Sequence, residues 1–174
     1  MKRVFWLTGL SGSGKTTIAK GFEDLFNKRT LGKCQRLDGD ISREILCKDL
    51  GFTSNDRLLN IERNAFVASL LIKHDITAIC SFISPTEVIR ERAKTIIDPN
   101  NFRLIYVKCS LQECIERDSK GLYEKAVKGE IKKFTGITDI YEEPKNPNLI
   151  LDTEKETVEE SIQKLYDYYF FSYY

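Results

Sequence analysis

The glycine-rich segment 9–16, Gly-Leu-Ser-Gly-Ser-Gly-Lys-Thr, constrains the fold of this chain more than any other stretch of the sequence. It matches G-x-x-x-x-G-K-[ST] in full, and it follows a strand-like run and opens a helix-like one, which is the context of a P-loop. Glycines let backbone N–H groups turn toward phosphate oxygens, and the helix N-terminus adds a partial positive charge. The segment therefore predicts a nucleoside triphosphate site directly after the first strand.

The residue types of this loop also predict individual roles. Lys15 would reach the β- and γ-phosphates, and the Thr16 hydroxyl would ligate Mg²⁺ beside them. A glycine-rich turn that only joins a strand to a helix is the structural alternative, but the full pattern arises by chance in under ~1% of chains of this length. The residues predicted to bind the nucleotide here are Gly9, Ser11, Gly12, Ser13, Gly14, Lys15, Thr16 and Thr17.

The apolar pattern of the whole chain predicts an α/β fold. Strand-like runs occupy residues 3–8, 76–83, 103–107 and 149–151, with a weaker run at 34–37. Helical spacing joins Ile18, Phe22 and Leu25, and it recurs over residues 61–72 and 158–169. Alternating strands and helices form mainly parallel sheets with helices on both faces. We therefore predict one domain over residues 1–174, a P-loop NTPase three-layer sandwich with about five strands.

The segment 118–143 interrupts this alternation. It is polar, contains Gly121, Gly129 and Gly136, and carries many lysines. Mobile covers of binding sites are commonly built in this way. We therefore predict a helix plus loop that acts as a lid.

Charge and composition exclude several classes of protein. The 174 residues include 27 Lys+Arg and 26 Asp+Glu, so the formal net charge is +1, which argues against a nucleic-acid binder with a strongly basic surface. No window reaches ~18 apolar residues, so no membrane span is expected. The five cysteines form no C-x-x-C pair, and the start lacks a signal-peptide pattern. A cytoplasmic protein with reduced thiols is the resulting prediction.

Other P-loop classes fit the chain poorly. The N-K-x-D motif by which GTPases read their base is absent, and the strand at 76–83 ends without the carboxylate of a motor ATPase. Asp38 and Asp40 are acidic residues that follow the strand-like run 34–37. A kinase that acts on a small acceptor fits these features best.

Ordered blocks along nearly the whole chain resemble adenylylsulfate (APS) kinases. That family transfers the γ-phosphoryl group of ATP to the ribose 3′-hydroxyl of a nucleotide whose 5′-phosphate carries sulfate in a mixed anhydride. The similar blocks lie at residues 7–17, 37–40 with Arg43, 49–52 with Asp56, Arg57, Asn60 and Ile61, 81–85, 117–118, 120–123, 134–137 and 151–153.

The resemblance implies roles for the acidic pair. Asp38 and Asp40 would orient or deprotonate the acceptor hydroxyl, with Asp40 as the base and Asp38 sharing Mg²⁺ with Thr16. Positioning and charge neutralisation dominate phosphoryl transfer, so a carboxylate suffices for this task. For Asp40 the structural alternative is an N-cap of the next helix.

The resemblance also implies contacts to both substrates. Arg43 and Arg57 would grip the anionic 5′ group of the acceptor, since their planar forks suit oxyanions. Arg117 would neutralise the transferring phosphate together with Lys120, and Arg117 and Thr153 would contact ATP. The acceptor base would lie between two aromatic rings, and two polar residues would line its pocket; these are Phe52, Phe134, Asn60 and Ser84. For each of these residues a plain core or surface role is the alternative.

Departures from the family pattern leave the acceptor open. Members usually have two arginines at positions 62 and 63 and Tyr-Arg at 86 and 87, whereas this chain has Glu62-Arg63 and Thr86-Glu87. If all of these positions faced the pocket, the local charge would change by about −4. Three readings follow: APS as acceptor, a cytidine 5′-diphosphoramidate as in related kinases of capsule biosynthesis, or a non-catalytic nucleotide-binding regulatory domain.

The aromatic C-terminal stretch 166–174 has two interpretations. Seven of its nine residues are Tyr or Phe. A last helix packed on the sheet explains most of them. A homodimer contact is the alternative, because exposed aromatic clusters mark interfaces.

Overall fold

The computed structural model describes residues 2–171, and its five strands form one parallel sheet in the order β2-β3-β1-β4-β5. The strands are β1 (Val4–Thr8), β2 (Lys33–Asp38), β3 (Ile76–Ser81), β4 (Phe102–Lys108) and β5 (Leu149–Asp152). The helices are α1 (Lys15–Arg29), α2 (Gly39–Glu44), α3 (Ser54–Lys73), α4 (Glu87–Ile97), α5 (Leu111–Arg117), α6 (Leu122–Val127) and α7 (Val158–Phe171).

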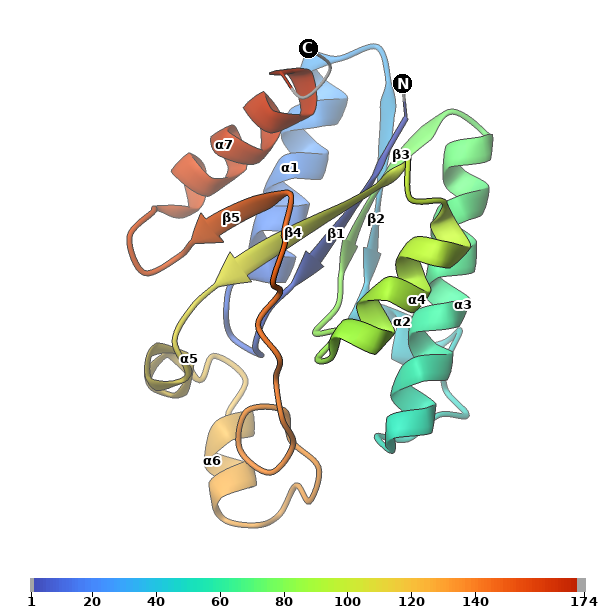
Figure 1. Cartoon of the computed structure of the whole chain (residues 1–174). Helices are drawn as coiled ribbons and strands as arrows, with labels where there is room; N and C mark the ends of the chain where they lie inside the picture. Colours follow the sequence, from blue (N-terminus) through green and yellow to red (C-terminus); the bar gives the residue numbers. More distant parts are fainter. Residues whose placement is uncertain (1, 172–174) are drawn as a thin grey trace.

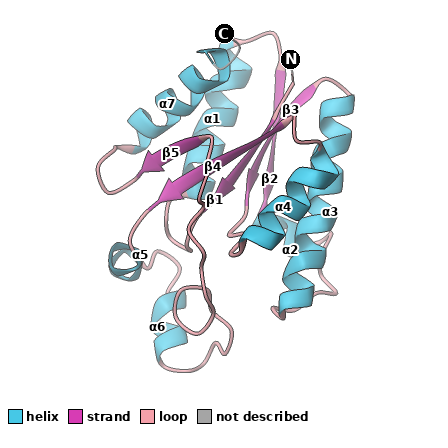
Figure 2. Ribbon diagram, in the orientation of Figure 1, coloured by secondary structure: helices cyan, strands magenta, loops and turns pink. Residues whose placement is uncertain are grey.

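Two pairs of helices cover the two faces of the sheet. The helices α1 and α7 pack on one face, and α3 and α4 pack on the other (Figures 1 and 2). Side chains alternate along β1, so Phe5 and Leu7 join the α1–α7 core while Val4 and Trp6 join the α3–α4 core. The predicted three-layer α/β sandwich is confirmed.

The predicted strands lie within one or two residues of the observed ones. The largest difference, two residues, is at the end of the run 76–83, since β3 ends at Ser81 and the chain leaves the sheet. Ser84 has a φ of 45° and is held there from two sides. Trp6 Nε1 donates to its Oγ at 2.8 Å, and Arg90 donates to its carbonyl oxygen at 2.9 Å. Residues 82–85 therefore form a wall beyond the strand ends.

The sequence pattern revealed only part of the helical structure. The three predicted helical segments correspond to α1, α3 and α7. The helix α4 was not predicted, although Ile89, Ala93 and Ile97 form a buried stripe on it. Charged neighbours surround that stripe, and Arg90, which lies inside the core, breaks the apolar pattern.

The segment 118–143 consists of α6 and a loop, as predicted. It lies beyond the carboxyl ends of the strands (Figure 1) and has its own small apolar cluster. Tyr123 and Phe134 pack edge to face at 4.9 Å in this cluster, against Leu10 of the P-loop. The predicted lid, residues 118–143, is therefore packed on the glycine-rich loop.

The C-terminal aromatic stretch is partly described. Tyr169 is buried against Phe26, with ring centroids 4.9 Å apart, while Phe170 and Phe171 are exposed. The last three residues of the stretch, 172–174, lie outside the described part of the chain. A packed last helix thus accounts for the buried side of α7. Within residues 2–171, a helix with the length and apolar character of a membrane span does not occur.

Candidate active site

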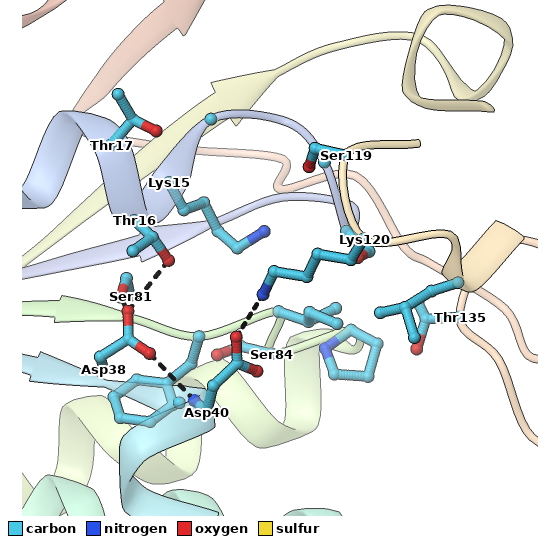
Figure 3. Close-up of a pocket in the computed structure, with 18 of the residues that line it drawn as sticks. Lys15, Thr16, Thr17, Asp38, Asp40, Ser81, Ser84, Ser119, Lys120 and Thr135 are labelled. Atoms are coloured by element: carbon cyan, nitrogen blue, oxygen red, sulfur yellow. Dashed lines mark hydrogen bonds and ion pairs between the residues drawn. The ribbon is translucent and has the colours of Figure 1, made fainter. Parts of the chain in front are cut away.

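A cavity of about 1040 Å³ opens where the parallel strands end. Ligands of open α/β sheets bind at this edge. We call one part of it the P-loop end and the other the distal end. The P-loop end is lined by Ser11, Gly12, Gly14, Lys15, Thr16, Thr17, Arg117 and Thr153, and the distal end by Arg43, Phe52, Arg57, Asn60, Ser84 and Phe134. Asp38, Asp40 and Lys120 also line the cavity (Figure 3).

The P-loop is held in shape by its own residues. Gly14 has a φ of 96° at the start of α1, a backbone conformation that disfavours other residues. Lys15 Nζ donates to the carbonyl oxygens of Gly9 and Leu10 at 2.9 and 2.6 Å. Burial lowers the pKa of Lys15 to about 8. An oxyanion in the cavity would restore the favourable environment for its charged form.

Two of the residues predicted to bind the nucleotide lie next to the cavity but are not part of its lining. Gly9 and Ser13 do not line the cavity, but both accept hydrogen bonds from Lys15 Nζ, Ser13 Oγ at 3.4 Å. A Cβ at Gly9 would collide with the backbone oxygen of Val107. These two residues support the lysine and leave little room for larger ones.

Asp38 links the P-loop helix to the sheet. Its Oδ2 accepts hydrogen bonds from Thr16 Oγ1 and Ser81 Oγ, each at 2.9 Å. Burial alone would raise the pKa of Asp38, but the hydrogen bonds from Ser81, Thr16 and the Asp40 backbone outweigh it and lower that pKa. The carboxylate is therefore ionised at neutral pH and fixed in position.

The structure corrects the alternative role considered for Asp40. The N-cap of α2 is Asp38, whose Oδ1 accepts the Asp40 backbone N–H at 3.0 Å. Asp40 lies in the first turn of α2 with its side chain in the cavity, where it pairs with Lys120 of the lid (Figure 3). The carboxylate of Asp40 is thus free of a capping role.

Arginine and phenylalanine side chains meet at the distal end. The Arg43 guanidinium lies over the Phe52 ring at 4.4 Å, and Arg57 lies 5.8 Å from the same ring. Phe52 is 54% exposed, whereas Phe134 is buried against Tyr123. Both predicted aromatic residues line the cavity, and Phe52 offers the more open ring.

Arg117 and Thr153 form a bridge beside the P-loop. Arg117 donates to Thr153 Oγ1 at 3.1 Å and to its carbonyl oxygen at 2.7 Å. Thr153 Oγ1 in turn donates to the Ser13 carbonyl at 3.1 Å. The strand β5 and the helix α5 therefore place a cation next to the glycine-rich loop; contact of Arg117 and Thr153 with ATP stays a prediction.

Several lining residues were not singled out from the sequence. Ser81 lies opposite Asp38 in the β2–β3 register, and pairing these two strands in the sequence could have identified Ser81 as a neighbour of Asp38. Thr135 contacts Arg57 across 78 positions, a separation that local patterns do not reveal. The other lining residues without a predicted role include Ser119, Lys133 and residues 156–158.

The two unusual glutamates lie outside the cavity. Glu62 pairs with Arg92 at 2.6 Å, and Glu87 pairs with the buried Arg90 at 2.7 Å. Neither lines the cavity. The charge change of about −4 required both glutamates to face the pocket, and they do not, so the departures at these positions do not change the charge of the pocket by that amount.

The oxygen donors near the P-loop fit Mg²⁺. Thr16 Oγ1 and Asp38 Oδ2 are 2.9 Å apart and line the cavity beside Lys15. Mg²⁺ is bound by one or two carboxylates together with phosphate oxygens and waters. Among the described residues, no group of three or more His, Cys, Asp or Glu side chains forms a metal cage. A metal at Thr16 and Asp38 would therefore complete its shell from nucleotide and water.

Comparisons with known proteins agree with this geometry. The family model described as adenylylsulphate kinase matches residues 1–152. An adenylyl-sulfate kinase of Halothermothrix orenii is 53% identical, covering 94% of this chain and 86% of that protein. A probable adenylyl-sulfate kinase of Aeropyrum pernix is 48% identical, covering 94% and 90%.

A solved structure gives the same result. The Mycobacterium tuberculosis APS kinase, in complex with AMPPNP and APS, is 38% identical with a TM-score of 0.91, covering 95% of this chain and 96% of that one. The match therefore spans the P-loop, the distal end and the lid together. The resemblance found in the sequence is confirmed, and this chain belongs to the adenylylsulphate kinase family.

Proposed function

We propose that this protein transfers the γ-phosphoryl group of ATP to the ribose 3′-hydroxyl of adenylyl sulfate, giving 3′-phosphoadenylyl sulfate and ADP. One observation carries the proposal: a single cavity joins the P-loop end to the distal end, where Arg43 and Arg57 flank the exposed ring of Phe52. A triphosphate at one end and an anionic nucleotide at the other would place a hydroxyl near Asp38 and Asp40. The enzymes named above support the choice of substrates.

The transfer needs positioning and neutralised charge more than covalent chemistry. The acceptor oxygen attacks the γ-phosphorus while the bond to the leaving ADP oxygen breaks, and Asp40 takes the hydroxyl proton. Lys15 and Arg117 offset the charge that develops on the phosphoryl oxygens. Bound at Thr16 and Asp38, Mg²⁺ would supply further charge neutralisation.

The acceptor-side alternatives lose their motivation in this geometry. A cytidine diphosphoramidate acceptor was suggested by departures from the family pattern on the acceptor side, and the two that change charge, Glu62 and Glu87, lie outside the cavity. A non-catalytic regulatory domain would not need the charged groups Lys15, Asp40 and Arg117 around one cavity. We therefore favour adenylyl sulfate.

Three properties stay predictions. Mg²⁺ dependence follows from the oxygen pair at Thr16 and Asp38. A homodimer would use the exposed Phe170 and Phe171. A cytoplasmic location follows from the sequence pattern.

The decisive assay offers ATP and Mg²⁺ with either adenylyl sulfate or cytidine 5′-diphosphoramidate, and separates the nucleotide products. We expect turnover of adenylyl sulfate at about 1–100 s⁻¹, the usual range of kinases. The Asp40→Asn variant should lose roughly 10²–10⁴-fold in kcat if Asp40 is the base. Turnover of only the cytidine compound would overturn the proposal, and full activity of Asp40→Asn would remove Asp40 from the mechanism.

A further inference from the structure

We propose that Asp139 is a positioning residue for acceptor binding, which holds the Arg57 guanidinium and so ties the loop 133–139 to α3 across the distal end of the cavity. The proposal rests on the proposed function, because its kinetic readout is the affinity for adenylyl sulfate. It gives a role to a residue of the lid loop that does not itself line the cavity.

Arg57 connects α3 to the lid loop through several donors. Its Nη2 contacts Asp139 Oδ2 at 3.0 Å and the Lys133 carbonyl oxygen at 3.1 Å. Its Nη1 donates to Thr135 Oγ1 at 3.0 Å, and its Nε donates to the Phe52 carbonyl oxygen at 3.2 Å. One side chain thus joins the Phe52 turn to the loop, and Asp139 is its only carboxylate partner among the described residues.

The loop is built so that Asp139 moves together with the cavity wall. The backbone N–H of Asp139 donates to the Phe134 carbonyl at 3.1 Å, and that of Gly136 donates to the Asp139 carbonyl at 2.7 Å. Thr135 and Asp139 also form an isolated bridge. Phe134 and Thr135 line the cavity, so the ion pair between Arg57 and Asp139 also helps to hold these two lining residues in position.

The charge of Asp139 also matters at this place. The Arg57 side chain is only 12% exposed, and it lies beside the same ring as Arg43. Burial and the nearby charge of Arg57 lower the pKa of Arg43. Asp139 balances this pair of cations and fixes the orientation of the Arg57 fork, because charge-assisted hydrogen bonds are directional. Without that carboxylate, Arg57 would lose the one charged partner that its Nη2 has within residues 2–171, and it would keep its contacts with neutral oxygens.

The test compares Asp139→Asn with Glu130→Gln, which removes the same charge from an exposed lid residue without a side-chain partner in the described structure. We expect Asp139→Asn to raise the KM for adenylyl sulfate roughly five- to twentyfold. The KM for ATP, kcat and the melting temperature should stay close to those of the wild type, and Asp139→Glu should restore part of the affinity. Glu130→Gln should leave all values unchanged.

Two results would overturn the proposal: an unchanged KM for adenylyl sulfate in Asp139→Asn, or an equal loss toward both substrates. Hydrogen exchange of residues 133–139 without any substrate separates this proposal from the proposed function. Exchange there should rise in Asp139→Asn and not in Glu130→Gln, whichever nucleotide the enzyme phosphorylates. If the wild-type protein does not phosphorylate adenylyl sulfate, the proposed function is refuted. If hydrogen exchange of residues 133–139 is unchanged in Asp139→Asn, the proposal that Asp139 holds this loop on Arg57 is refuted.

Discussion

The P-loop end and the distal end of the cavity are built in opposite ways. At the P-loop end, Lys15 donates to carbonyl groups only five and six positions away. At the distal end, Arg57 reaches Thr135 and Asp139 across 78 and 82 positions. The glycine-rich loop of the P-loop end is therefore determined by a contiguous segment, which Arg117 and Thr153 join through tertiary contacts. The distal end exists only once the sheet has brought distant segments together.

The charged side chains of the cavity differ in their exposure to water. Lys15 is 8% exposed, whereas the side chains of Asp40 and Lys120, which bridge the cavity from α2 to the lid, are 69% and 52% exposed. Buried charges interact strongly, and exposed pairs contribute little to stability. Because Lys15 lies at the predicted phosphate site and Phe52 at the predicted acceptor site, we infer that substitutions at the P-loop end abolish the chemistry, while those at the distal end change substrate affinity.

Among substitutions within the two ends of the cavity, the largest effect is expected for Lys15→Met. The variant keeps the length of the side chain but removes the charge next to the transferring phosphate, so kcat should fall roughly 10²–10³-fold. Stopped assays with saturating substrates measure this loss. Folding should persist, because the buried ammonium is desolvated and an apolar chain suits the site. A kcat near the wild-type value would contradict the assignment of the P-loop end as the site of chemistry.

A smaller effect, confined to one substrate, is expected for Phe52→Ala. The exposed ring is predicted to stack on the acceptor base, and stacking of a base on an aromatic side chain contributes about 1–3 kcal/mol. The KM for adenylyl sulfate should therefore rise roughly five- to a hundredfold. The KM for ATP should not change.

Phe66→Ala is the matched control, since Phe66 is 56% exposed and does not line the cavity. An equal effect of both variants on adenylyl sulfate would show that the distal end does not recognise the base through Phe52. A change in the KM for ATP in Phe52→Ala would contradict the inference that the distal end binds only the acceptor.

The contrast between the ends explains what could be predicted from the sequence. The fold followed from the alternation of apolar runs, and the P-loop contacts followed from residues 9–16, because both depend on neighbours along the chain. For the cap of α2 the sequence offered Asp40 as an alternative role, whereas the structure gives that cap to Asp38. Both residues suit the start of a helix, and the boundary depends on β2 pairing as far as Asp38.

The distal end was harder to predict for a physical reason. Its residues were named through a family resemblance, yet their partners depend on tertiary contacts such as those of Arg57 with the lid loop. The orientation of Glu62 and Glu87 was likewise open, because a residue beside a site motif can face either the cavity or a neighbouring helix. Only the packing of α3 against α4 places Glu62 next to Arg92.

The smallest effects are expected for Glu62→Gln and Glu87→Gln, which test whether the unusual glutamates influence the acceptor. Both lie outside the cavity in ion pairs with α4 arginines, so the KM for adenylyl sulfate should stay within about twofold of the wild-type value. Loss of the exposed Glu62 pair should lower the free energy of unfolding by at most about 1 kcal/mol, measured by urea denaturation, whereas Glu87→Gln removes the carboxylate partner of a buried arginine and is not limited to that value. Glu87→Gln should show the larger loss, since its partner Arg90 is buried. A fivefold or greater gain in affinity for adenylyl sulfate in either variant would contradict this expectation. It would mean that these carboxylates weaken acceptor binding at long range, although neither lines the cavity.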